Sequence, residues 1–203
     1  MNYLAHIYLA RHSDDAMLGA LLGDFVKPHS GDTYSAEIEA EILTHRKVDS
    51  FTDSHPLVLG AKALFEGARR RYAGILLDVF YDHVLATSWE RYSDVPLHAF
   101  IGRFYGALAR SADMLPANLA RAAPYMIEQD WLGSYADYAG VEIAIGRIST
   151  RLSKNGHLLR EGLADLKANH AQLESGFHAF FPDLIAFVDS RRHAARPALA
   201  ILL

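Results

Sequence analysis

Residues 75–89, ILLDVFYDHVLATSW, decide the fold class of this chain. Drawn as a helix, the segment has apolar side chains on nearly every face, which is the pattern of a helix buried in a protein core. Elsewhere apolar residues recur at helical spacings, and no stretch alternates apolar and polar residues over a sustained length. The sequence therefore predicts an all-α protein.

The composition is that of an ordinary globular protein. The chain has 203 residues, of which 51% are hydrophobic and 22% charged, and one core can serve this length. We therefore expect a single-domain helical bundle over residues 1–203, with residues 193–203 as a flexible or docking tail. No signal peptide and no membrane-spanning apolar run are found, so a cytoplasmic protein is predicted. The net charge of −4 gives no overall attraction for nucleic acid.

Capping residues and prolines predict where helices begin. Ser13 and Ser35, each followed by acidic residues, have the pattern of N-caps, and a loop at residues 26–35 separates their helices. The last long helix is predicted over about residues 158–181, with Pro182 ending or kinking it. The other helices are expected to begin near Pro56, Pro96, Pro116 and Asp137.

Three polar residues, Asp78, Asp82 and His83, interrupt the apolar segment of residues 75–89. The two aspartates are four positions apart and share a helix face, while the histidine lies about 100° further round. Burying carboxylates without partners is costly. Because the chain has no cysteine, only its histidines, aspartates and glutamates can hold a metal ion. A carboxylate and an imidazole at consecutive positions are arranged as in the metal sites of helical bundles.

A second polar cluster lies in ILTHRKVDSFTDSH at residues 42–55. His45, Asp49 and Asp53 follow one another at intervals of four and form one stripe on a helix. Mixed imidazole and carboxylate ligands suit hard or borderline divalent cations. The structural alternative is a solvated face on which neighbouring basic residues pair with the carboxylates.

Two single residues extend this set: His6 in the apolar NYLAHIYLA and Asp24 at the end of MLGALLGDF. A core histidine and a helix-terminal carboxylate are their structural alternatives. The signatures of other catalytic classes are missing, since no GxSxG elbow, P-loop or GxGxxG occurs and cysteine catalysis is excluded by composition. The sequence therefore favours metal-assisted hydrolysis.

Six segments carry a family likeness: NYLAHIYLA at 2–10, LLGDF at 21–25, THRKVDSFTD at 44–53, LDVFYDHVL at 77–85, EQDWLGSY at 128–135 and LESGFHAFFP at 173–182. Together they resemble the acyl carrier protein phosphodiesterase family over nearly the whole chain. This family is regarded as a divergent branch of the HD-domain metal phosphohydrolases. The sequence departs from the His-Asp doublet of that larger group, because it has Asp82 and His83 in the reverse order.

The resemblance implies an HD-domain-like helical fold and a phosphodiesterase that cleaves 4'-phosphopantetheine from a serine of holo acyl carrier protein. It implies dependence on Mn2+, with Mg2+ or another divalent cation as alternatives and one or two ions bound. It also implies that Asp24 is essential. We expect metal ligation by His6, Asp24, His45, Asp82 and His83, and catalytic roles for Asp24, His45, Asp49 and Asp78.

Recognition of an acidic carrier protein requires local positive charge on this chain. Arg69, Arg70 and Arg71 form the densest basic run, and Arg46 and Lys47 lie within the second polar cluster. A solvated face is the alternative for such a run. Two other functions remain open: an HD-type metal phosphohydrolase acting on nucleotides or other small phosphodiesters, and a helical binding module without catalysis.

Overall fold

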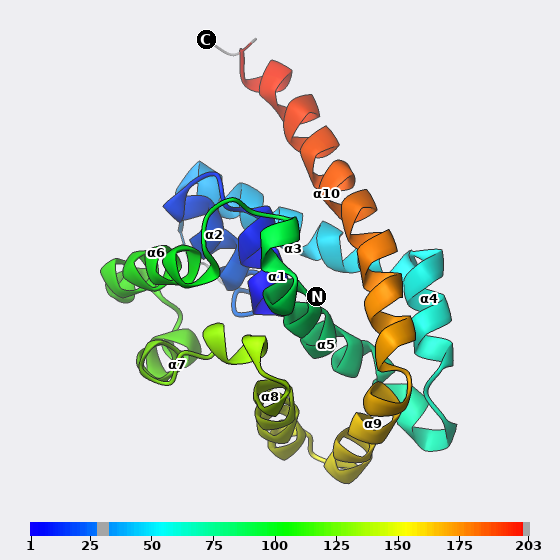
Figure 1. Cartoon of the computed structure of the whole chain (residues 1–203). Coiled ribbons are helices and arrows are strands. Elements are labelled where there is room, and N and C mark those ends of the chain that lie inside the picture. Colours follow the sequence, from blue (N-terminus) through cyan, green and yellow to red (C-terminus); the bar gives the residue numbers. More distant parts are fainter. Residues whose placement is uncertain (28–32, 201–203) are drawn as a thin grey trace.

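The computed structural model describes residues 1–27 and 33–200, with side chains up to residue 193, and these residues form helices and no strand (Figure 1). The predicted all-α fold is confirmed. The middle of the expected loop, residues 28–32, and the last three residues of the expected tail lie outside the described part. The α-helices are α1 (Tyr3–Leu9), α2 (Asp14–Leu22), α3 (Ala36–Ser54), α4 (Pro56–Ala63), α5 (Ala73–Thr87), α6 (Leu97–Arg110), α7 (Ala117–Glu128), α8 (Tyr138–Arg151), α9 (Gly156–Ala168) and α10 (His170–Ala200). Short 3-10 helices lie between them: η1 (Gly67–Tyr72), η2 (Trp89–Arg91), η3 (Ala112–Met114) and η4 (Gly133–Ala136).

Several helices begin where their capping residues predicted. The hydroxyl oxygen of Ser13 accepts the backbone N–H of Ala16 at 2.9 Å, and that of Ser35 accepts the N–H of Ile38 at 3.3 Å. These bonds satisfy donors that the first turn of a helix leaves unpaired. Helix α4 begins at Pro56, and α6, α7 and α8 follow Pro96, Pro116 and Asp137, respectively.

Helix α5 lies at the centre of the packing and contacts α1, α4, α8, α9 and α10. Its side chains and those of α10 supply much of one large hydrophobic core, in which Phe80, Tyr81, Phe177 and Phe180 are less than 2% exposed. The apolar pattern of residues 75–89 thus comes from burial on several sides. No helix in the described part combines the length and apolar character that crossing a membrane requires.

The C-terminal helices differ from the prediction of one helix over residues 158–181. The chain breaks between α9 and α10 because Asn169 leaves the helical conformation and its side-chain amide donates to the carbonyl of Asp165 at 2.9 Å. Pro182 does not end the helix, and α10 continues to Ala200. The proline is exposed while its neighbour Phe181 is buried, so packing on the core side maintains the helix.

Helices α1, α2 and α3 pack closely and bring the N-terminal motifs together. A Cβ on Gly19 of α2 would stand 2.6 Å from the carbonyl oxygen of Ile38 on α3, so glycine permits this approach. Arg192 of α10 donates to both carboxylate oxygens of the buried Glu41, at 3.0 and 2.9 Å, and to the carbonyl of Leu9 at 2.6 Å. This side chain joins α10 to both α1 and α3.

Candidate metal centre

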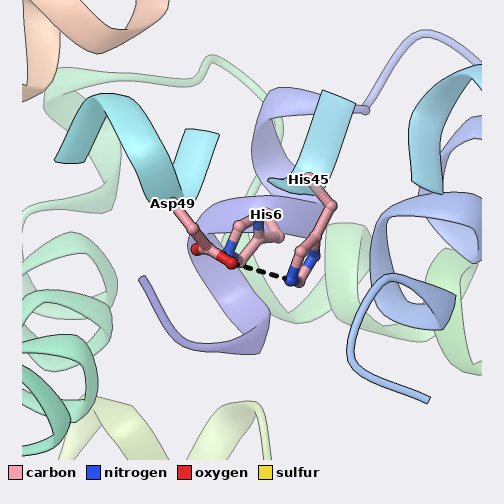
Figure 2. Close-up of side chains that lie close together, drawn as sticks. All are labelled: His6, His45 and Asp49. Carbon is pink, nitrogen blue, oxygen red and sulfur yellow. Dashed lines mark hydrogen bonds and ion pairs between the residues drawn. The ribbon is translucent and has the colours of Figure 1, made fainter. Parts of the chain in front are cut away.

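Helices α1 and α3 bring three of the predicted residues into contact (Figure 2). Nε2 of His6 lies 3.1 Å from Oδ1 of Asp49, and Nε2 of His45 lies 3.3 Å from Oδ2 of the same carboxylate. The two imidazole rings stack with their centroids 3.7 Å apart. One donor atom from each residue lies within 4.8 Å of the other two, which is close enough for one cation to contact all three.

The orientation of His45 follows from the LLGDF segment at the end of α2. Nδ1 of His45 donates to the carbonyl oxygen of Ala20 at 2.7 Å, so Nε2 is the nitrogen that faces the carboxylates. A Cβ on Gly23 would stand 2.2 Å from Cγ of His45, so any other residue would displace the ring. The glycine of this motif therefore makes room for the imidazole.

Asp24 follows that glycine and lies at the open side of the cluster. Its Oδ1 is 3.5 Å from Nε2 of His45, and its side chain is 44% exposed. Asp49 is similarly exposed, at 42%, whereas His6 and His45 are buried. The two imidazoles thus lie on the buried side of the centre, and the two carboxylates lie on the side that faces solvent.

The electrostatics of the cluster favour a cation between the carboxylates. Burial lowers the pKa of His6 to about 4, so this ring is neutral at neutral pH. Burial also lowers the pKa of His45, but hydrogen bonds with Asp24 and Asp49 outweigh it and raise the value to about 9. For Asp49, burial raises the pKa, yet hydrogen bonds from both histidines dominate and hold it well below its usual range. Positive charge at Nε2 of His45 is therefore stabilised.

Asp78 lies at the edge of this centre. The α-amino group of Met1 donates to its Oδ1 at 2.9 Å and lies 3.6 Å from Oδ1 of Asp49. The carbonyl oxygen of Met1 is in turn 3.2 Å from Nε2 of His6. Asp78 is therefore connected to the cluster through the first residue of the chain and does not contact its histidines.

The structure does not bring Asp82 and His83, the other two predicted ligands, into the cluster. The buried carboxylate of Asp82 accepts the backbone N–H groups of Leu4 at 2.7 Å and Ala5 at 3.1 Å, and so caps the start of α1. Burial raises the pKa of Asp82 to about 7, although both hydrogen bonds lower it. Nδ1 of His83 donates to the carbonyl of Tyr135 at 2.7 Å. Both side chains therefore have backbone partners.

The polar stripe on α3 also belongs to the cluster only in part. His45 and Asp49 face the cluster, but Asp53, one turn further on, is 70% exposed and pairs with Lys62 at 2.7 Å. The solvated-face alternative therefore describes this last member of the stripe. Helix α3 turns only two of its three predicted polar residues toward α1.

The basic residues expected to dock the partner also have unequal surroundings. Arg69 makes a bidentate ion pair with Asp165, at 2.6 and 2.9 Å, and Arg70 donates to the carbonyl oxygens of Phe65 and Ala63. Both therefore have partners within the fold around η1. Arg70, Arg71 and Lys47 are exposed. Arg46, next to His45, donates to the carbonyl of Val26 at 3.0 Å.

Tyr3, which is part of no predicted site, lies beside the centre. Tyr3 stacks on Phe25, the residue after Asp24. Burial, and after it the charge of Asp24, raise the pKa of the Tyr3 hydroxyl to about 12, although the positive charge of Arg151 lowers it. One feature of the sequence indicated that Tyr3 belongs to the site: it lies three residues before His6, on the same face of a helix.

Comparisons with known proteins agree with the motif likeness. A profile of the family described as acyl carrier protein phosphodiesterase matches residues 1–184. Acyl carrier protein phosphodiesterases from Salmonella agona and Salmonella newport are each 34% identical over 200 residues, covering 98% of this chain and 100% of theirs. That of Photorhabdus laumondii is 32% identical over 194 residues, or 94% and 96% of the two chains. The chain belongs to the acyl carrier protein phosphodiesterase family.

This membership confirms the predicted family and its class of enzyme, the phosphodiesterases. The match spans the α1, α2, α3 and α5 segments that carry the candidate metal centre and its surroundings. No solved structure matches the chain. The HD-domain-like character of the fold therefore stays a prediction, as do the metal and the role of each site residue.

Proposed function

We propose that this member of the family hydrolyses the phosphodiester between 4'-phosphopantetheine and a serine of holo acyl carrier protein, using a divalent cation held by His6, His45 and Asp49. The observation that carries this proposal is the convergence of three donor side chains from α1 and α3 beside the exposed Asp24. Family membership supports the choice of substrate, and the geometry supports the location of the metal ion.

The donor set fits a divalent cation. Two imidazole nitrogens and carboxylate oxygens, with no sulfur, suit Mn2+ and similar ions. The Ala20 carbonyl fixes the ring of His45 through Nδ1, as backbone acceptors commonly do for metal-binding histidines. The raised pKa of His45 shows that the carboxylates favour positive charge at Nε2. An ion bound there would replace that proton.

The metal ion and the residues around it would have different roles in the hydrolysis. A bound divalent ion lowers the pKa of water and neutralises phosphoryl oxygens. Asp24, exposed and 3.5 Å from His45, is placed to accept a proton from the attacking water. The new bond joins the water oxygen to phosphorus, the bond from phosphorus to the serine oxygen breaks, and the serine oxygen takes a proton from solvent as it leaves, while Asp24 later releases its proton to solvent. Asp78 accepts a hydrogen bond from the α-amino group of Met1 at the edge of the site.

Docking of an acidic carrier protein requires positive charge on the surface of this chain. Lys47 is exposed on α3, but it lies two residues from both His45 and Asp49 and therefore on about the opposite face of the helix. A cation there attracts an acidic partner to this helix only at long range. Arg71 remains exposed as well, but Arg69 and Arg70 already have partners within the chain.

The direct test is incubation of the protein with holo acyl carrier protein, followed by intact mass measurement of the carrier. With Mn2+ we expect conversion to the apo form and release of 4'-phosphopantetheine. Excess chelator should stop the reaction, and added Mn2+ should restore it. Turnover that persists after exhaustive chelation would contradict the metal. Hydrolysis of nucleotides without any conversion of the carrier would favour the alternative HD-type phosphohydrolase.

A further inference from the structure

The most basic stretch of the chain without an acidic residue spans the end of α8 and the start of α9. Residues 143–160 contain four arginines and lysines and no aspartate or glutamate, and no other acid-free stretch contains more than three. The whole chain has a net charge of −4, so this segment concentrates positive charge on a protein that is negative overall. We call its four cations the α8 basic surface: Arg147, Arg151, Lys154 and Arg160.

Arg147 and Arg160 are held by neutral partners. The guanidinium of Arg147 donates to Oε1 of Gln129 at 2.7 Å and lies 4.6 Å from the centroid of the Trp131 ring. That of Arg160 donates to the hydroxyl oxygen of Ser149 at 2.8 Å, which brings it to the last turn of α8. These contacts orient the two cations and do not neutralise them.

Arg151 and Lys154 are exposed, and neither forms an ion pair with a carboxylate in the part of the chain that the structure describes. Arg151 follows Arg147 by four residues and so lies on the same face of α8. Lys154 lies in the turn between α8 and α9. By contrast, Lys167 of α9 is paired with a carboxylate oxygen of Glu142 at 2.7 Å. The α8 basic surface therefore carries charge that is available to a partner.

This surface borders the metal centre through the first two residues of the chain. Asn2, Arg147 and Arg151 line one small cavity of about 40 Å³, so the three residues lie close together. Met1 precedes Asn2, and its carbonyl oxygen is 3.2 Å from Nε2 of His6. A partner that binds the α8 basic surface is therefore next to the centre.

An exposed apolar side chain adjoins these cations. Ile143 is 52% exposed and lies one turn before Arg147, on the same face of α8. Protein interfaces combine apolar contacts with charged and polar groups, whereas a nucleic acid backbone is bound mainly by cations. The combination on α8 favours a protein partner.

We propose that the α8 basic surface docks the acidic carrier protein and so presents its modified serine to the metal centre. This inference rests on the proposed function, because that function supplies an acidic protein as the substrate. Complementary charges speed the encounter of two proteins and fix their relative orientation. The reaction requires such an orientation, since the phosphodiester is joined to the carrier and must reach the centre.

Reversal of two exposed charges tests this with apo carrier protein, which binds without turnover. Binding would be measured on a biosensor surface with Mn2+ present. Arg151→Glu combined with Lys154→Glu should weaken binding by roughly 10-fold at low salt, mainly through slower association, and the loss should shrink as salt screens the charges. With holo carrier protein, kcat/KM should fall by a similar factor while kcat stays close to the wild-type value.

Arg71→Glu combined with Arg121→Glu is the matched control, because both arginines are exposed, lie on η1 and α7, and give the same change in net charge. This pair should bind the carrier with nearly wild-type affinity. Mn2+ affinity and thermal unfolding should be the same in all variants, which separates docking from loss of metal or fold.

Equal losses of carrier affinity in the two pairs, or no loss in the α8 pair, would overturn the inference even if the wild type converts holo carrier protein normally. An α8 pair that loses binding of an RNA oligonucleotide but keeps that of the carrier would assign the surface to nucleic acid instead. Wild-type protein that binds the apo carrier through α8 but does not convert the holo form would contradict only the proposed function. Absence of any carrier binding by the wild type would overturn both.

Discussion

Helices α3 and α5 each carry a histidine and an aspartate toward the protein interior, but they give these side chains different partners. On α3, His45 and Asp49 contact each other and His6 at a centre that is open to solvent. On α5, Asp82 and His83 bond to backbone groups of other segments. Buried polar residues can thus serve chemistry or complete the hydrogen bonding of the fold. The deciding feature is whether the donor atoms face one another.

The largest effect is expected from removing charge on α3. Asp49→Asn keeps the shape of the side chain but removes its anionic oxygens, so Mn2+ binding should be lost and phosphodiesterase activity should fall by roughly a thousandfold or more. Asp53→Asn is the control on the same stripe, since Asp53 is exposed and pairs with Lys62. Steady-state rates with holo carrier protein would measure both. Similar losses of activity in the two variants would contradict the view that Asp49 belongs to the metal centre and Asp53 does not.

A smaller loss is expected when the ring of His45 is displaced but no ligand is removed. In Gly23→Ala the new Cβ would stand 2.2 Å from Cγ of His45, so the imidazole must move. A shift of this kind should reduce activity by roughly 100-fold. Gly60→Ala on α4 is the matched control, because its Cβ meets nothing within 4 Å. Wild-type kinetics in Gly23→Ala would mean that the position of this ring is not critical.

On α5 the expected effect is on stability and not on metal binding. Asp82→Asn replaces one of two buried acceptors with an amide donor facing a backbone N–H of α1. The free energy of unfolding should fall by about 1–3 kcal/mol, the cost of leaving a buried group unpaired. Chemical denaturation and Mn2+ titration of the same samples would separate the two effects. Normal stability with lost Mn2+ affinity would instead make Asp82 a ligand.

The sequence predicted the fold well where the signal is local. Caps such as Ser13 and the apolar pattern of residues 75–89 depend on neighbours in the chain, and the structure contains the corresponding elements. The break at Asn169 was missed because one side-chain hydrogen bond to Asp165 ends α9 within a continuous helical pattern. The effect of Pro182 on the helix was overestimated, because its ring lies on the exposed side of α10.

The candidate site could be predicted only in part, because it is assembled from distant segments. Spacing on one helix identified His45 and Asp49 as neighbours, but it could not show that Asp53 turns to solvent. The partners of Asp82 lie on α1, almost eighty residues away, so its capping role has no local pattern.

The most direct test of the contrast between α3 and α5 is the position of the metal in crystals grown with Mn2+. Anomalous diffraction from manganese should show density in contact with His6, His45 and Asp49, with Asp24 beside it, and none against Asp82 or His83. Density bound to Asp82 and His83, or an empty α3 centre in crystals of active enzyme, would contradict the account.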